Sequence, residues 1–234
     1  MAGFSGKLRA FFALPGDPVT PGDSAVRINL VPFSAKVKGK IGTYMLGNWP
    51  SEKRELSNPA YANPKGFIQV TQDNLSTRIS EHFTLGQFLT KDQLSIWPKY
   101  VVLQSRLLDK LELTIQELRK EGHPVRGLFV MSGFRTPAYN EKGVGAGGRS
   151  EVSRHQYGDA ADVYPDDGGT GRMDDLNGDG RVDLKDARIL AAAADAVERQ
   201  HPELVGGIGI YPATSAHGPF VHIDARGTRA RWGA

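Results

Sequence analysis

The chain has 234 residues, of which 39% are hydrophobic and 24% charged, and it contains no cysteine. This length accommodates one large domain, or a core domain with a small module attached. The net charge of +3 is too small, and the basic residues are too scattered, to indicate nucleic-acid binding. The absence of cysteine excludes disulfides and thiolate ligands, so a bound metal must be held by nitrogen and oxygen.

Residues 1–75 are rich in Pro, Gly and Asn and favour a small β-rich N-terminal module. Short strands are expected at residues 25–33, 40–46 and 67–71. Trp49 and the Lys-Gly-Lys-Ile-Gly-Thr-Tyr run beside it form either a binding surface or, as is more common for aromatic residues, the core of the module. The apolar patch at residues 10–14 is shorter than a signal peptide requires, and no stretch is long enough to span a membrane.

Residues 76–234 carry mixed helix and strand patterns. Apolar residues recur with helical spacing from Tyr100 to Glu121, and Gly122 ends the pattern. An alanine-rich helix is expected at 184–200. Strand patterns follow at residues 127–131, 159–164, 205–211 and 220–225. This mixture predicts an α+β fold.

Three residues with metal-ligating side chains stand out in this second part. His155 and Asp162 are seven positions apart, and His222 follows sixty residues later in a strand pattern. Two imidazoles and one carboxylate leave a fourth tetrahedral position open, which is typical of a catalytic zinc site. Such a zinc lowers the pKa of its water to roughly 7 and promotes hydrolysis. The alternative is that these are unrelated loop residues.

The same residues lie in three ordered sequence blocks. Residues 153–162 match S-x-H-x-x-G-x-A-x-D, residues 132–140 read S-G-F-R-T-P-A-Y-N, and residues 221–224 read V-H-I-D. With these blocks the chain resembles the zinc D-alanyl-D-alanine peptidases, whose fold is shared with the hedgehog signalling domain. The resemblance covers about residues 78–226, including S-E-H-F-T-L at 80–85. It implies a central antiparallel sheet with flanking helices and hydrolysis of peptide bonds in bacterial peptidoglycan.

The resemblance also implies roles for individual residues. Zinc would be bound by His155, Asp162 and His222. Arg135 would hold a carboxylate or carbonyl of the peptide, for which its planar fork is suited, unless it is a surface arginine paired with a nearby acid. Ser153 and Gln156 would contribute to substrate binding.

The identity of the general base is left open by the sequence. Several branches of the family carry a glutamate in E-x-x-H, whereas this chain has Pro219 three residues before His222. His217 is the preferred candidate, since a histidine pKa suits proton transfer; otherwise it is an exposed loop residue. Asp224 competes for the role, or it orients a ligand imidazole by accepting its second N–H.

A second metal signal lies in an insertion at about residues 166–190. Residues 175–186 match a twelve-residue calcium loop with glycine at position 6. The expected ligands are Asp175, Asn177, Asp179, Arg181 through its carbonyl, Asp183 and Asp186. Because no helix precedes it, the loop resembles half of a dockerin repeat. The alternative is an acidic loop that only caps the following helix.

The sequence thus predicts a zinc peptidase of peptidoglycan, either a carboxypeptidase or a crosslink endopeptidase, with a structural calcium. A non-catalytic metal-bearing domain for wall binding or signalling is the alternative, which the missing E-x-x-H glutamate keeps open. A phage-encoded wall-degrading enzyme is a further possibility. We expect a monomer that acts in the periplasm or outside the cell, binds peptidoglycan peptides and does not bind nucleic acid.

Overall fold

A computed structural model describes residues 9–17, 25–145 and 148–233. The chain divides into two compact units, each built from two stretches of sequence. The first unit comprises the described residues up to Ser105 together with Phe134–Gly158. The second comprises Arg106–Gly133 and the described residues from Asp159 onward. Helices and strands occur in both, which confirms the α+β class.

The first unit is built on a four-stranded sheet with the order β1-β2-β5-β6. Strand β1 runs parallel to β2, and the other neighbours are antiparallel. The strands are β1 (Arg9–Ala13), β2 (Ala25–Pro32), β5 (Gly66–Val70), β6 (Lys99–Val101) and a separate hairpin of β3 (Lys40–Ile41) and β4 (Tyr44–Met45). The helices are short: α1 (Pro50–Lys53), α3 (Pro137–Glu141) and the 3-10 turns η1 (Phe33–Ala35), η2 (Pro59–Tyr61), η3 (Leu85–Phe88) and η5 (Arg154–Tyr157).

Several expectations for this region need correction. The predicted strand at 40–46 is a hairpin, because Gly42 adopts a φ of +57° and reverses the chain. Strand β5 pairs with β6 across residue 75, and the division into an N-terminal module and a second domain at that residue stays a prediction. Trp49 is fully buried and its indole N–H donates to the Gln156 carbonyl at 2.9 Å, so it belongs to the core of the first unit.

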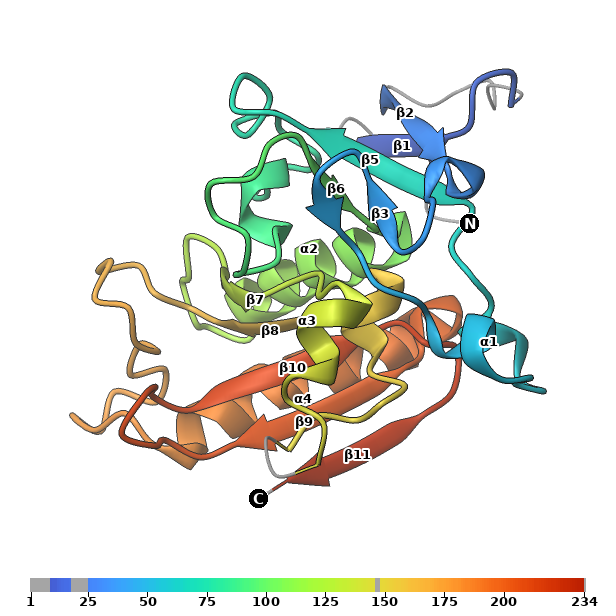
Figure 1. Ribbon diagram of the computed structural model, residues 1–234. Coiled ribbons are helices and arrows are strands. Elements are labelled where there is room, and N and C mark those ends of the chain that lie inside the picture. The colour runs from blue at the N-terminus through green and yellow to red at the C-terminus, as the bar shows by residue number, and fades with distance from the viewer. Residues whose placement is uncertain (1–8, 18–24, 146–147, 234) are drawn as a thin grey trace. The chain divides into compact units, whose positions relative to one another are not determined.

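The second unit contains a five-stranded sheet with the order β11-β9-β10-β8-β7 (Figure 1). All neighbours are antiparallel except β11 and β9, which run parallel. The strands are β7 (Phe129–Ser132), β8 (Ala160–Tyr164), β9 (Gly207–Tyr211), β10 (Phe220–Asp224) and β11 (Ala230–Gly233). The helical elements are α2 (Ser105–Lys120), α4 (Leu184–Gln200) and the turn η6 (Pro202–Leu204).

The two long helices follow from local sequence signals. Helix α2 buries the apolar stripe that predicted it, although it starts at Ser105 because Tyr100 belongs to β6. Helix α4 has the predicted bounds, and the Asp183 side chain caps it by accepting from the Lys185 N–H. No helix among the described residues is long and apolar enough to cross a bilayer.

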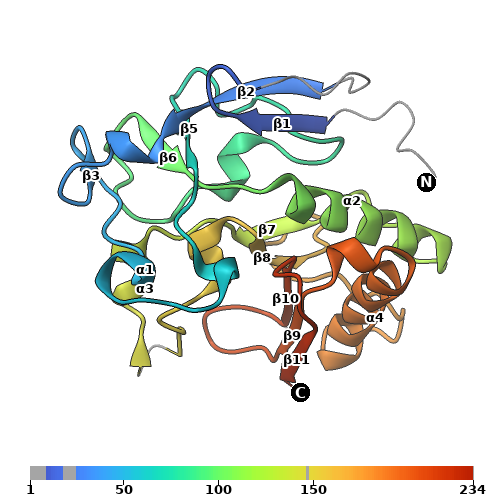
Figure 2. The same cartoon turned by 90° about the vertical axis from the view of Figure 1, so that its right-hand side faces the viewer.

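Helix α4 covers one face of the five-stranded sheet (Figure 2). Ile208 and Ile210 of β9 line a surface groove together with Ala191 and Ala192 of α4, so these two side chains point toward the helix. Because side chains alternate along a strand, Gly207 and Gly209 belong to the opposite face. That opposite face carries Asp162, His222 and Asp224.

Candidate metal centre

Asp162 and His222 lie directly opposite each other on β8 and β10. Residues paired in this way share a face, and His222 also pairs with Gly209, so both side chains lie on the face away from α4. The distance from Asp162 Oδ1 to His222 Nδ1 is 3.0 Å, and both residues are buried. A strand pair therefore fixes one carboxylate oxygen beside one imidazole nitrogen.

Asp224 holds the other side of the His222 ring. Its Oδ2 lies 3.0 Å from His222 Nε2, and its Oδ1 accepts from the Gly207 N–H at 2.8 Å. The Arg226 guanidinium completes the carboxylate's partners through Nε and Nη2. If Nε2–H donates to Asp224, then Nδ1 is the nitrogen that faces Asp162 and is able to bind a metal.

The hydrogen bonds of His222 and Asp224 shift the pKa values of both side chains. Burial by itself lowers the pKa of His222, but hydrogen bonds to Asp162 and Asp224 outweigh burial, and the pKa is raised above its ordinary value. Burial by itself raises the pKa of Asp224, but hydrogen bonds from His222 and Arg226 outweigh it and hold the pKa below its usual range. Asp224 is therefore a carboxylate that accepts hydrogen bonds.

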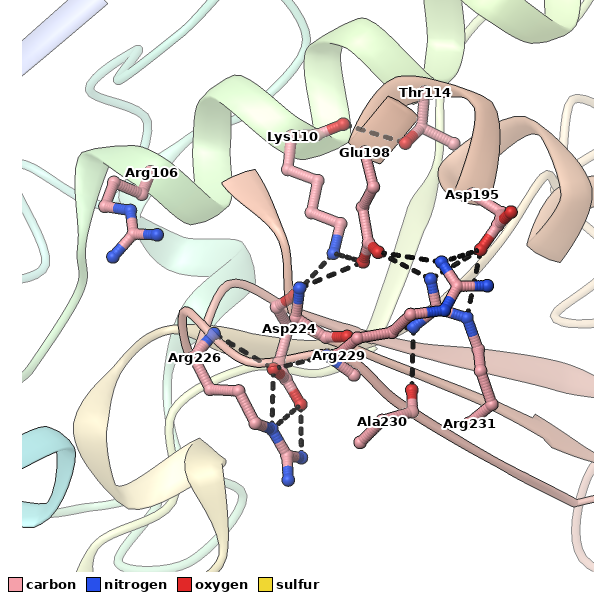
Figure 3. Close-up of polar contacts among 12 residues, drawn as sticks. Arg106, Lys110, Thr114, Asp195, Glu198, Asp224, Arg226, Arg229, Ala230 and Arg231 are labelled. Carbon is pink, nitrogen blue, oxygen red and sulfur yellow. Dashed lines mark hydrogen bonds and ion pairs between the residues drawn. The ribbon is translucent and has the colours of Figure 1, made fainter. Parts of the chain in front are cut away.

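A buried charged network supports the end of β10 (Figure 3). Lys110 of α2 is fully buried and its Nζ lies 2.6 Å from Glu198 Oε1 and 2.5 Å from the Asp224 carbonyl oxygen. The second oxygen of Glu198 pairs with Arg231 of β11 at 2.5 Å. The strand that carries His222 is thereby tied to both long helices and to β11.

His155 lies in the first unit, on the turn η5, and is buried. The turn ends at Gly158, whose φ is +68° and where a Cβ would approach the Val102 carbonyl oxygen to 2.3 Å, so glycine is required. Within the second unit, Asp162 and His222 are two buried donors side by side, and His155 of the first unit as their third partner stays a prediction. Two nitrogens and one oxygen suit zinc.

The predicted substrate-binding residues lie around η5. The Arg135 N–H donates to the His155 carbonyl at 3.1 Å, and the Arg135 side chain is half-buried. Ser153 precedes η5 and its carbonyl accepts from the Gln156 N–H. The Gln156 side chain is buried and its amide donates to the Glu151 carbonyl at 2.8 Å, so its contacts stabilise the loop rather than face solvent.

His217 lies in the loop between β9 and β10 and is half-buried. Its Nδ1 is 2.8 Å from the Gly218 carbonyl oxygen, and its ring contacts Phe220 edge-on with centroids 5.0 Å apart. Phe220 is two residues before His222 on β10, so it shares the face of the metal donors. The loop thus leads His217 toward that face, but His217 is not one of the grouped donors.

The predicted calcium loop forms a set of tight turns. Asp175 accepts from the Gly180 N–H at 2.7 Å, and Asp186 accepts from the N–H groups of Leu176 and Asp183 at 2.8 Å. Among the described residues, these carboxylates are not one of the groups of three gathered within 4.8 Å. Asp186 therefore acts in this structure as the capping-box residue of α4.

Two aromatic residues near His222 were missed. The Trp232 ring lies 5.1 Å from the His222 ring, and its indole N–H donates to the Tyr211 hydroxyl at 2.9 Å. Strand β11 was not among the expected strands, because residues 230–233 form a run of only four residues. The two glycines of β9 were the available signal, because they leave room for a large side chain from a neighbouring strand.

Comparison of the chain with models of known protein families, with curated proteins and with solved structures finds no match.

Proposed function

We propose that this chain is a zinc-dependent peptidase that hydrolyses peptide bonds of peptidoglycan, as a carboxypeptidase or a crosslink endopeptidase. The observation that carries the proposal is the buried pair of Asp162 and His222, whose Oδ1 and Nδ1 are 3.0 Å apart on neighbouring strands. A buried carboxylate beside an imidazole, with a second buried histidine seven residues earlier in the chain, is the donor set of a catalytic zinc.

The order of the sequence blocks supports a hedgehog/D-alanyl-D-alanine peptidase-like fold. The S-G-F-R-T-P block runs from the end of β7 to the cap of α3, where the Tyr139 N–H donates to Thr136 Oγ1. The S-x-H-x-x-G-x-A-x-D block spans η5 and enters β8, and H-x-D lies in β10. Arg135 lies in the segment between β7 and α3, His155 in η5, Asp162 in β8 and His222 in β10.

Each of the proposed site residues has its own role in the reaction. When bound, zinc supplies an acidified water at neutral pH and polarises the scissile carbonyl. Asp224 accepts the Nε2–H of His222 and thus presents Nδ1 as the ligand atom. His217 moves the proton to the leaving amine, and Arg135 anchors a carboxylate or carbonyl of the peptide.

A non-catalytic metal-bearing domain for wall binding or signalling is the second candidate. Pro219 at the position of the E-x-x-H glutamate favours it, because proline has no titratable group. The peptidase and the non-catalytic domain would both bind the metal, but only the peptidase would turn over a substrate.

The decisive experiment combines metal analysis with digestion of purified peptidoglycan. The zinc-loaded protein is expected to release D-alanine or muropeptides that mass spectrometry identifies. Asp162→Asn is expected to lose both zinc and product, whereas the matched control Asp73→Asn, an exposed turn aspartate, keeps both. Stoichiometric zinc without product from any wall preparation would leave the binding domain as the function. Export to the periplasm or the cell surface follows if peptidoglycan is the substrate.

The loop at 175–186 is proposed to bind a structural calcium ion. The hydrogen bond from the Gly180 N–H to Asp175 joins positions 6 and 1 of the motif, and Asp179, at position 5, has Lys185 as its cation in this structure. Calcium at millimolar concentration is expected to raise the thermal unfolding midpoint. Asp175→Asn should abolish that rise and Asp73→Asn should keep it. A midpoint that chelation does not change would assign the loop to helix capping alone.

A further inference from the structure

One row of side chains crosses the five-stranded sheet of the second unit. Strand register places Trp232 opposite Gly209, Gly209 opposite His222, and His222 opposite Asp162. Directly opposed residues share a face, so the row joins the edge strand β11 to the proposed metal donors. Trp232 is the outermost member of this row.

Gly209 determines where the Trp232 indole lies. A Cβ on Gly209 would be 2.3 Å from both Cε2 and Nε1 of the indole. The indole therefore rests on the bare backbone of β9 and reaches the His222 ring, with centroids 5.1 Å apart and ring planes inclined by 50°. Any larger residue at 209 would displace the indole from this place.

Trp232 is joined by two further aromatic rings on the same face. Its indole N–H donates to the Tyr211 hydroxyl at 2.9 Å, and the Tyr211 ring stacks on Phe220 with centroids 4.6 Å apart and planes inclined by only 5°. Tyr211 is 36% exposed and Trp232 is half-buried, whereas Phe220 is buried and supports the Tyr211 ring from below. Trp232, Tyr211 and Phe220 form what we call the aromatic strip.

The chemistry of the aromatic strip suits one class of ligand. A stacked ring presents an apolar face, while the Tyr211 hydroxyl adds a polar group at the edge. A pyranose ring has the complementary features, since its C–H groups can lie on an aromatic face and its hydroxyl and amide groups form hydrogen bonds at the rim. A peptide without sugar has no such rigid apolar face.

We propose that the aromatic strip binds an amino-sugar ring of the glycan chain, so that the enzyme prefers stem peptides still attached to sugar. The inference rests on the proposed peptidase function, because the strip borders His222 and would hold the sugar next to the reacting peptide. Trp232 and Tyr211 are then specificity-determining residues that act on substrate choice.

The test compares two substrates that differ only in the sugar: a disaccharide-linked stem peptide and the same peptide released by amidase. The wild-type protein is expected to show a kcat/KM about tenfold higher for the sugar-linked form, and Tyr211→Ala and Trp232→Leu should reduce the ratio toward one. Phe129→Ala is the matched control, because Phe129 is an exposed aromatic residue (44%) that packs on Tyr164 at the far edge of the same sheet. Equal kcat/KM values for the two substrates in the wild type would overturn the proposal.

A binding experiment separates this inference from the peptidase proposal. The probe is a peptide-free tetramer of N-acetylglucosamine, titrated against the full chain and followed by calorimetry. Binding that Tyr211→Ala weakens about five- to tenfold supports the strip even if the protein cleaves nothing. Two results would overturn the inference by showing that the strip only supports His222. One is cleavage of peptidoglycan without any binding of the tetramer. The other is a Tyr211→Ala variant that loses turnover of both substrates equally.

Discussion

Asp162 Oδ1 and His222 Nδ1 lie 3.0 Å apart because β8 and β10 pair in the register that sets these two residues opposite each other. A slip by one residue would turn His222 to the face covered by α4 and remove it from the donor set. The pair is thus positioned by a hydrogen-bonded sheet rather than by a loop. Rigid elements of this kind hold donor atoms with the precision that a metal site requires.

Replacing Asp224 by asparagine tests the support of the His222 ring. The variant keeps the shape of the side chain but loses the charge that accepts from Nε2–H and from Arg226. Zinc affinity is expected to fall by roughly 10–100-fold with the fold retained. Competition against a fluorescent chelator measures the affinity, and circular dichroism checks the fold. Unchanged affinity in Asp224→Asn, with Asp73→Asn as the neutral comparison, would remove Asp224 from the site.

The sequence was most informative where a signal is local. The bounds of α4 follow from the Asp183 cap and the alanine-rich helical period, and both lie within a few residues of the helix ends. The strands that carry Asp162 and His222 are also readable from their apolar residues, whereas the register that sets the two opposite each other comes from the structure. The specific hedgehog/peptidase fold and the zinc remain predictions.

The sequence was least informative where structure depends on distant partners. Strand β11 has only four residues and gives a weak local signal, and it pairs with β9, whose glycines leave room for Trp232. The side-chain amide of Gln156 suits a ligand, yet in the fold it donates to the Glu151 carbonyl. The backbone carbonyl of Gln156 accepts from the indole of Trp49, more than a hundred residues away. Lys110 reads as a surface residue of α2, and only the fold reveals the buried Glu198 that pairs with it.

Substituting Gly209 by alanine tests the row that contains Trp232. The added Cβ would meet the indole at 2.3 Å, so the indole must move away from His222. We expect a loss of about 1–3 kcal/mol in the free energy of unfolding, as for other overpacked sites, and a change in tryptophan fluorescence. Gly168→Ala is the control, because its Cβ would meet only Thr170 at 3.4 Å. Equal stability of the two variants would contradict the close packing of Trp232.

Removing the buried ammonium group of Lys110 should destabilise the second unit. Lys110→Ala removes the ammonium group that lies 2.6 Å from Glu198 Oε1 and donates to the Asp224 carbonyl, and leaves Arg231 as the cation paired with Glu198. The free energy of unfolding is expected to fall by about 3–5 kcal/mol. Lys120→Ala is the control: its side chain is 67% exposed and its pair with Glu117 is worth about 0–1 kcal/mol. Urea denaturation measures both, and similar losses would argue against a buried ion pair at Lys110.

Asp195 makes the stability of the second unit depend on pH. Burial by itself raises the pKa of Asp195, but hydrogen bonds from Arg231 and Arg229 outweigh burial and hold the pKa below its ordinary value of 3.8. The unfolded chain therefore takes up this proton at a higher pH than the folded chain does. The stabilisation is complete above the unfolded-state pKa and is lost as the pH falls through the folded-state pKa.

Asp195→Asn removes this titration while Arg231 keeps its contact with Glu198. Urea denaturation between pH 3 and about 6 should show a shallower loss of stability on acidification in the variant than in the wild type, since one fewer proton is taken up on unfolding in that range. Asp73→Asn, which removes an exposed turn carboxylate, provides the comparison. Identical slopes for the wild type and Asp195→Asn would mean that the arginine pairs do not stabilise the carboxylate in solution, and that β11 is held to α4 by Glu198 alone.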